Sequence, residues 1–286
     1  MSKVASFVIA WALSVVSLPA CATFCIGTPQ DSVFVTRLLA EVRSQSDTNI
    51  PLFFARKFIG RPYVAHTLEV GNDRSVVVNT RELDCTTLVE NVTALTLCAY
   101  QKHYTYQDFL NQLVRMRYAG GQMNGYTSRL HYFTEWIVES SRKGIATEIQ
   151  QPVPPYTGIQ KIKVGYMSTH PSAYAALKKH PEYVKDIRKR ENSINGKTFR
   201  YIPKSKIANT RLLRQAVHDG DIIAITCRKA GLDIAHLGFA VWRKDGLHLL
   251  NASMLHKKVV EEPMTLYTYL QKHPSHTGIR VLRIQR

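Results

Sequence analysis

Apolar side chains recur every three to four positions through much of the first half of the chain, the spacing of amphipathic helices. Residues 31–44 (DSVFVTRLLAEVRS) carry such a stripe, which runs from Phe34 to Val42. A second helix is predicted to begin after Asn49, where a proline suits the first turn, and to end at Gly60.

The next helical pattern covers residues 84–100, where Leu88, Val92 and Leu95 recur on one stripe. This spacing predicts a helix that is buried along one face. A further helix is predicted over 106–118.

Three more features complete the helical half of the chain. Thr105 and Asp108 have the spacing of a capping box at the start of the helix over 106–118. Gly120 and Gly121 would end that helix, and residues 122–139 lead from a glycine loop into an aromatic-rich helix.

The last third of the chain is rich in strands. Apolar and β-branched runs predict strands over the ranges 221–226, 236–242, 247–252 and 279–284. Between the two halves, 151–158 reads as a loop and 171–210 as helix with a short strand, while 68–79 reads as a hairpin around Gly71-Asn72-Asp73. Helices first and an antiparallel sheet last define an α+β class. We expect a single domain over 23–286 with an insertion at about 140–215.

Residues 1–22 have the pattern of a secretory signal peptide. Lys3 precedes an apolar run, which is followed by Ala20 and Ala22 in an A-x-A arrangement that predicts cleavage after Ala22. The run is short for a membrane span. Uncleaved anchoring and lipid attachment at Cys21 are the alternatives, although Pro19 is atypical of a lipidation site. We expect an exported, periplasmic protein without a membrane span.

The chain is strongly basic, with 38 Lys and Arg against 21 Asp and Glu and a net charge of +17. An exported protein of this charge meets anionic wall polymers before it meets nucleic acid. The densest basic run, Lys185–Arg190, has no interleaved aromatic residues for base stacking. We therefore expect no nucleic-acid partner.

After cleavage the chain would keep Cys25, Cys85, Cys98 and Cys227. Cys85 and Cys98 cannot pair if they share one helix, because the rise per residue would place them about 20 Å apart. Other pairings stay open. There is no CxxC, HExxH or tight Cys/His cluster, so we expect no metal and no cofactor.

Cys85 stands at the predicted start of a helix, directly after Asp84, which suits the cap position. A helix N-terminus favours the thiolate, which would lower the pKa of the thiol, and its free N–H groups can bind an oxyanion. Cys85 is therefore a candidate nucleophile, with a plain structural cysteine as the alternative.

A nucleophile of this kind needs a base. His236 opens an apolar strand two residues before Gly238, and a neighbouring antiparallel strand could bring Asn251 to the same face. His248 is at an odd offset from Asn251 and would face away, whereas His256, past the strand end, is a rival for the third place.

Four segments, KFIGRPYVAHTLE, VVNTRELDCTTLVENV, GYTSRLHYFTEWI and GDIIAITCRKAGLDIAHLGFAVW with the later LLNAS, carry a family resemblance. Together they resemble the NlpC-type superfamily of papain-like cell-wall cysteine amidases, and within it the AmiA-like branch. The resemblance runs from about Asp31 to the end of the chain. It implies a papain-like fold with Cys85 as nucleophile, His236 as general base and acid, and Asn251 in the third polar position.

The resemblance also implies a substrate site. Tyr63 matches a tyrosine that lines the site in the superfamily, and the branch block with Tyr126, Arg129 and His131 either shapes the cleft or is helix-start packing. Asp84 could bind an alanine ammonium, but it is also the predicted cap.

The activity implied is that of an N-acetylmuramoyl-L-alanine amidase, acting on soluble anhydro-muramyl fragments of peptidoglycan as a monomer without a cofactor. Two alternatives remain. One is an endopeptidase that cuts after γ-D-glutamate in the stem peptide. The other is a non-catalytic muropeptide-binding protein.

Overall fold

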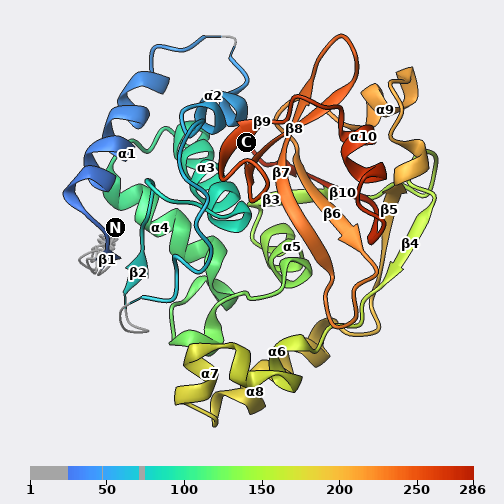
Figure 1. The fold of residues 1–286 in the computed structure, drawn as a ribbon. Coiled ribbons are helices and arrows are strands. Elements are labelled where there is room, and N and C mark those ends of the chain that lie inside the picture. Colours follow the sequence, from blue (N-terminus) through green and yellow to red (C-terminus); the bar gives the residue numbers. More distant parts are fainter. Residues whose placement is uncertain (1–24, 47, 71–74) are drawn as a thin grey trace, which may run out of the picture.

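The computed structural model describes residues 25–46, 48–70 and 75–286, with helices in the first half of the chain and a sheet in the second (Figure 1). The helices are α1 (Pro29–Val42), α2 (Ile50–Arg56), α3 (Cys85–Tyr100), α4 (Tyr106–Arg117), α5 (Phe133–Arg142), α6 (Tyr166–Thr169), α7 (Ala175–Lys179), α8 (Tyr183–Ile194), α9 (Arg211–Ala216) and α10 (Leu266–Gln271). The strands are β1 (Cys25–Ile26), β2 (Val76–Val77), β3 (Ala146–Ile149), β4 (Gly158–Lys161), β5 (Thr198–Pro203), β6 (Ile222–Cys227), β7 (Ile234–Trp242), β8 (Leu247–Ser253), β9 (Lys258–Glu261) and β10 (His276–Ile284).

The predicted leader at 1–22, its cleavage site and Cys21 lie outside the described residues, as does the turn predicted at 71–73. Within the described residues, every helix is too short or too polar to cross a bilayer.

Neighbouring strands of the main sheet pair antiparallel. Its order is β4-β5-β10-β6-β7-β8-β9, and β3 also pairs with β10. A separate small sheet pairs β1 with β2 in parallel. Helices packed on a mostly antiparallel sheet agree with the predicted α+β class.

Two hydrophobic clusters cover the two faces of the sheet. Strand side chains alternate between faces, so Leu237 and Phe239 of β7 join the cluster with α1 to α5, while Ala240 joins the cluster with α9 and α10. On β8, Leu250 and Leu249 divide in the same way. Helix α3 crosses β7 and β8 on the first face.

The predicted one-sided burial of α3 is wrong. Every residue from Thr87 to Cys98 is buried, including Glu90, Asn91 and Thr93. The helix lies between α1, α2, α4 and the sheet, so no side of it faces water along this stretch. Periodicity could not reveal this, because the polar side chains that it places on the opposite face are buried too.

The predicted hairpin over 68–79 is also wrong. Val76 and Val77 form β2, but they pair with Cys25 and Ile26 of β1 in parallel. Residues 65–68 form turns. The β-branched run was read correctly as a strand, but its partner lies far away in sequence and could not be read from local spacing.

The other main elements agree with the predicted ranges to within a few residues. The capping box of Thr105 and Asp108 begins α4 as predicted. A second box, formed by Thr28 and Asp31, begins α1. The sequence patterns did not predict β1, β3, β4, β9, α6, α9 or α10.

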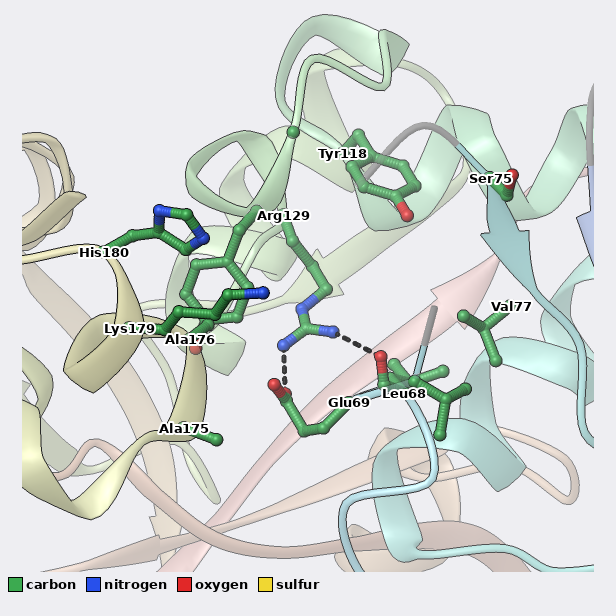
Figure 2. Close-up of a pocket in the computed structure, with 13 residues that line it drawn as sticks. Leu68, Glu69, Ser75, Val77, Tyr118, Arg129, Ala175, Ala176, Lys179 and His180 are labelled. Atoms are coloured by element: carbon green, nitrogen blue, oxygen red, sulfur yellow. Dashed lines mark hydrogen bonds and ion pairs between the residues drawn. The ribbon is translucent and has the colours of Figure 1, made fainter. Parts of the chain in front are cut away.

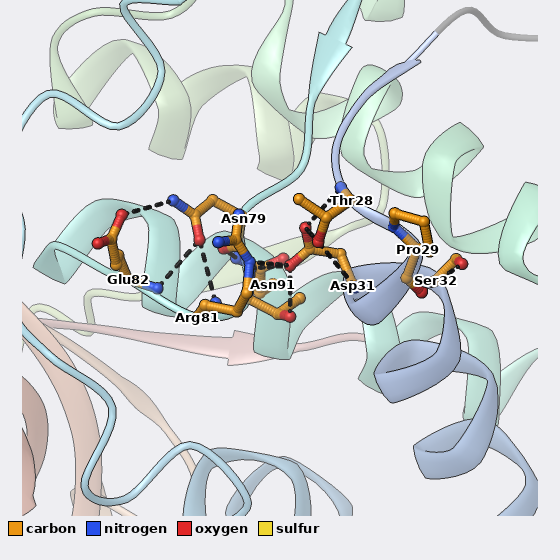
Figure 3. A network of polar contacts seen from close by, with 9 residues as sticks. Thr28, Pro29, Asp31, Ser32, Asn79, Arg81, Glu82 and Asn91 are labelled. Carbon is orange, nitrogen blue, oxygen red and sulfur yellow. Dashed lines mark hydrogen bonds and ion pairs between the residues drawn. The ribbon is translucent and has the colours of Figure 1, made fainter.

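Asp31 also connects α1 to the segment that leads into α3 (Figure 3). It is fully buried, and its Oδ2 accepts hydrogen bonds from Thr28 N–H (2.8 Å) and the Thr28 hydroxyl (2.7 Å). Its Oδ1 accepts from Thr80 N–H (2.8 Å) and the Thr80 hydroxyl (2.7 Å). Because Thr80 lies just before the start of α3, this network holds the entry to that helix.

Residues 140–215 extend the sheet through β3, β4 and β5 and carry a group of short helices. In Figure 1, α6, α7 and α8 lie together at one end of the molecule, next to α5. Their apolar side chains pack with Tyr126 and Tyr132 in a third cluster. This segment therefore packs against the Tyr126–Tyr132 region that precedes α5.

Candidate active site

Cys85 is the first residue of α3, and Asp84 caps the helix. Asp84 Oδ1 accepts hydrogen bonds from Thr87 N–H (2.8 Å) and the Thr87 hydroxyl (2.9 Å), and Asp84 N–H donates to Thr87 Oγ1 (2.9 Å). This closed box satisfies the free groups of the first turn. It holds Cys85 at the tip of the helix, where the residue keeps partial exposure.

The surroundings of the Cys85 thiol do not favour a thiolate. Burial raises its pKa to about 12, and the charge of Asp84 acts in the same direction. Hydrogen bonds from Leu237 N–H and the Thr86 hydroxyl offset only part of this rise in pKa. The expectation of a lowered pKa is thus wrong for the free protein, because desolvation outweighs the helix N-terminus.

Leu237, whose N–H contacts the Cys85 sulfur, directly follows His236 in β7, and Cys85 and His236 line the same cavity. Strand β7 has an irregularity here, since Ile225 of β6 pairs with His236 but Thr226 pairs with Ile234. The extra residue, Ala235, makes a β-bulge, a feature that often re-aims a side chain beside a site.

His236 binds Asn251 directly, with His236 Nε2 2.9 Å from Asn251 Oδ1. A carbonyl oxygen can only accept, so Nε2 carries the proton and Nδ1 holds the lone pair. Burial lowers the pKa of His236, although the bond to Asn251 partly opposes this. In the free protein the thiol and the imidazole are therefore both neutral near pH 7.

The two rival histidines bind elsewhere. His248 is fully buried, with Nδ1 2.8 Å from the Glu262 carbonyl and Nε2 2.9 Å from Asp245 Oδ1. His256 Nε2 lies 3.2 Å from the Glu262 carboxylate. Of the three candidates for the third place, Asn251 is the one that contacts His236.

Gly238 permits the close strand approach in this region. A Cβ at this position would lie 2.6 Å from the Leu250 carbonyl oxygen and 2.8 Å from Leu249. Any side chain here would force β7 and β8 apart, so the glycine is required by packing next to His236.

Cys85 and His236 line one cavity of about 200 Å³. His131 lies in the same cavity, and its Nε2 is 3.1 Å from the Tyr126 carbonyl. Burial, with the charge of Arg129, holds the pKa of His131 well below its usual value, so this ring is neutral. The other walls come from α5 and the residues before it, from the segment 166–174, and from the first part of β7 and the residues before it: Leu130, Tyr132, Phe133, Trp136, Met167, Tyr174, Leu232, Asp233, Ile234, Ala235 and Leu237, with Thr86 beside Cys85.

Arg129 belongs to a second cavity of about 390 Å³ (Figure 2). Its guanidinium forms an ion pair with Glu69, donates to the Leu68 carbonyl (3.2 Å) and lies over the Tyr126 ring. Figure 2 shows Lys179 of α7 extending into the same space. The two cavities share a wall, because Arg129 lines one while the next residue lines the other.

Tyr63 lies close to Cys85 and Asp84 but is not among the residues that line the Cys85 cavity. Burial raises its pKa, and the nearby Cys85 and Asp84 raise it further. The candidate residues thus fall into three places: Cys85, His236, Asn251 and His131 at the centre, Tyr126 and Arg129 in the adjoining cavity, and Tyr63 beside Asp84.

Sequence reasoning did not identify three residues near His236: Tyr269, His273 and Glu262. The Tyr269 ring of α10 stacks near the His236 ring, at 6.4 Å between centroids, and His273 lies 4.7 Å from Tyr269. The Glu262 carboxylate acts on the pKa of both His236 and Tyr269. No local pattern in the sequence marks these residues.

In the part of the chain that the structure describes, no group of three or more His, Cys, Asp and Glu side chains is placed to hold a metal ion.

A family model described as AmiA-like, N-acetylmuramoyl-L-alanine amidase-like, matches residues 53–279. An N-acetylmuramoyl-L-alanine amidase structure from Bacteroides uniformis has 39% sequence identity and a TM-score of 0.77, over 83% of this chain and 98% of that one. A "putative xylanase" from Bacteroides fragilis has 40% identity and a TM-score of 0.74, over 81% and 99%. A Legionella pneumophila protein shares the fold at 20% identity and a TM-score of 0.71, over 90% and 95%. We found no match among curated protein sequences.

Proposed function

This chain belongs to the AmiA-like family of N-acetylmuramoyl-L-alanine amidase-like proteins, and from that premise we propose that it is a cysteine hydrolase of peptidoglycan fragments. Its substrate would be a soluble anhydro-muramyl peptide, cut between the lactyl group of muramic acid and the first alanine. The observation that carries the proposal is the meeting of Cys85 with His236 in one cavity, with His236 bound to Asn251. We further propose that the arrangement is papain-like, of the NlpC type.

In the first half of the reaction, His236 Nδ1 would take the thiol proton while the Cys85 sulfur attacks the amide carbonyl carbon. General-base transfer during attack suits a pair that starts neutral. The N–H of Cys85, at the helix tip, would bind the oxyanion. The imidazolium would then give its proton to the alanine nitrogen as the C–N bond breaks, which leaves a muramyl thioester.

The second half would release the acyl group. His236 would take a proton from water as the water oxygen attacks the thioester carbon. Collapse of that intermediate would break the C–S bond, form the lactyl carboxylic acid and return the proton from the imidazolium to sulfur. Both halves require an imidazolium beside Asn251, whose Oδ1 would orient the ring but carries no full charge.

The bond preference follows from the donors available. A peptide cleaver must bind an alanine ammonium, but Asp84, the nearest carboxylate in sequence, has one oxygen committed to Thr87. Arg129 offers donors suited to lactyl, hydroxyl and carboxylate oxygens, whereas the neutral His131, whose Nε2–H donates to the Tyr126 carbonyl, offers Nδ1 as an acceptor for a hydroxyl. We therefore propose that they and Tyr126 bind the muramyl peptide, with Tyr63 beside the nucleophile.

Glycoside hydrolysis, the activity named for the Bacteroides fragilis protein, has less support here. It commonly needs a pair of carboxyl groups, one on each side of the scissile bond. Among the described residues lining the Cys85 cavity, Asp233 is the one carboxylate, and its Oδ2 accepts from Thr134 N–H at 2.6 Å. A thiol with a histidine suits acyl transfer instead.

Mass spectrometry of the products from a defined anhydro-muramyl tripeptide tests the proposal. We expect an intact peptide with a free N-terminal alanine and no reaction with Cys85→Ala. Cys98→Ala is the matched control on the same helix, and Cys227→Ser is a second control. L-Ala-D-Glu left on the sugar would indicate the endopeptidase, and binding without turnover would indicate a muropeptide-binding protein.

We also propose that the protein is exported, is cleaved after Ala22 and acts as a monomer. The support for export and cleavage is the A-x-A pattern after a short apolar run. N-terminal sequencing of protein from its native host should find Thr23, whereas a lipid on Cys21 would replace this with a tethered form. Light scattering of the purified protein tests the monomer.

A further inference from the structure

Among the buried carboxylates that the proposed mechanism does not use, Glu262 acts on His236. Glu262, directly after β9, is fully buried. The Ser253 hydroxyl donates to its Oε1 (3.4 Å), and His256 Nε2 lies 3.2 Å from the carboxylate oxygens. His256 N–H also donates to Ser253 Oγ (3.2 Å), which ties the three residues together. A buried carboxylate held in this way has a fixed position.

Strand geometry places this cluster next to His236. Asn251 and Ser253 lie two positions apart on β8, so both point to the same face. Asn251 binds His236 on that face. Continuing the β7–β8 register, in which Phe239 pairs with Leu250, would put His236 opposite Ser253. The Glu262 carboxylate, which is bound to Ser253, therefore lies on the same side of the sheet as Asn251 and the His236 ring.

The location matters because the proposed reaction creates charge on His236. Asn251 is neutral, so its oxygen offers the imidazolium a dipole rather than a counter-charge. A carboxylate in a buried, weakly screened place acts over a longer distance than an exposed one. The charge of Glu262 also favours the protonated form of His236, since it raises the pKa of that ring.

We propose that Glu262 is a positioning residue that supplies the missing counter-charge for the His236 imidazolium, and that Ser253 and His256 fix it in place. The proposal rests on the cysteine-hydrolase function proposed above. His256, the sequence-based rival of Asn251, would then act through Glu262 rather than on His236 directly.

Other groups also act on the protonation of His236. Asp84 favours the imidazolium, whereas His273 opposes it. His276 interacts with both His273 and His236, and its ring centroid lies 4.7 Å from that of His273. The Tyr269 ring also lies near the His236 ring. The test must therefore change Glu262 and leave these groups in place.

Glu262→Gln removes the charge and keeps the shape, and Glu261→Gln is the matched control. Glu261 is the preceding residue, but its carboxylate pairs with Arg56 (2.7 Å) and Arg243 (2.8 Å) instead. The first readout is the NMR titration of His236, assigned with a His236→Gln variant. We expect its midpoint to fall to lower pH in Glu262→Gln and to stay unchanged in Glu261→Gln.

The second readout is turnover of the anhydro-muramyl tripeptide. We expect kcat to fall about tenfold in Glu262→Gln with KM within about twofold, as for a group that acts on transition-state charge. If the variant does not fold, Glu262→Asp replaces it, because moving the charge back by one methylene must also lower the midpoint.

A folded Glu262→Gln protein with an unchanged His236 midpoint would overturn the proposal, whatever its activity. The same holds for a folded Glu262→Asp protein if that variant carries the test. If Glu262→Gln lowers the His236 titration midpoint but the wild-type protein has no hydrolase activity, the result would count against the function proposed above and would leave the charge coupling between Glu262 and His236 standing.

Discussion

Replacing Asn251 with alanine tests the assignment of the third site residue most directly. Asn251 Oδ1 accepts from His236 Nε2 at 2.9 Å and is almost fully buried. In the alanine variant the ring loses this acceptor and can turn about its side-chain bonds. Nδ1, the proposed base, would then no longer be held toward Cys85.

The size of the effect follows from the charge on the ring. In the free protein the bond joins two neutral groups and contributes about 1 kcal/mol. When His236 becomes an imidazolium the same bond is charge-assisted and contributes about 1.5–3 kcal/mol. Most of this gain exists only in the transition state and the intermediates. The difference between the two states, about 0.5–2 kcal/mol, corresponds to a fall in kcat of roughly 2- to 30-fold, with a smaller change in KM.

The assay is steady-state hydrolysis of an anhydro-muramyl tripeptide over a range of pH. Because the bond to Asn251 raises the pKa of His236, its loss should also move the acid limb of kcat/KM to lower pH. His256→Ala is the comparison, since His256 contacts Glu262 and not the His236 ring. Its loss of turnover should be several times smaller.

A reversed order of the two losses would refute the assignment. So would a folded Asn251→Ala protein with unchanged turnover and an unchanged acid limb. Circular dichroism and thermal melting of each variant separate these outcomes from unfolding.

Three further predictions concern stability and reactivity. Asp31→Asn should cost about 3 kcal/mol near neutral pH, measured by urea unfolding. Burial tends to raise the pKa of Asp31, but hydrogen bonds from Thr80 and Thr28 outweigh it and hold the pKa below its usual 3.8. The wild-type advantage should therefore be full above that value and be lost as the pH falls through the lower folded pKa; an advantage that grows in acid would contradict this. Glu90→Gln should cost about 3 kcal/mol because it leaves the buried Arg117, now 2.8 Å from Glu90, without its counter-charge; a variant as stable as the wild type would show that the pair is dispensable. Alkylation of Cys85 by iodoacetamide should be slow near neutral pH and accelerate as the pH rises, given the raised pKa, whereas fast labelling in mild acid would point to a resting thiolate–imidazolium pair.

Local signals in the sequence were sufficient for much of the framework. The capping box at Thr105 and the apolar stripe of α1 depend on residues within a few positions of one another, so spacing alone predicted them. The same holds for Cys85, because a cap residue directly before a thiol at a helix start is a local pattern. Strands β6, β7, β8 and β10 were recognisable because their apolar runs are long.

Pairings between distant segments could not be read in the same way. The partner of β2 is β1, about fifty residues earlier, so the local reading of a hairpin failed. Met167 and Tyr174 line the cavity of Cys85 although their segment carries no recognisable chemistry in the sequence. Such contacts depend on how the chain packs, and no spacing rule encodes them.

The sequence by itself determined which residues could do chemistry: a thiol at a helix start, a histidine before a glycine in a strand, and three polar candidates for the third place. The tertiary structure decided which of these meet and in what protonation state. Asn251, rather than His256, contacts His236 because β7 and β8 bring it diagonally across the sheet. Burial also reversed the expected pKa shift of Cys85, because desolvation depends on every element packed around a group, whereas the helix N-terminus is a local property of the sequence.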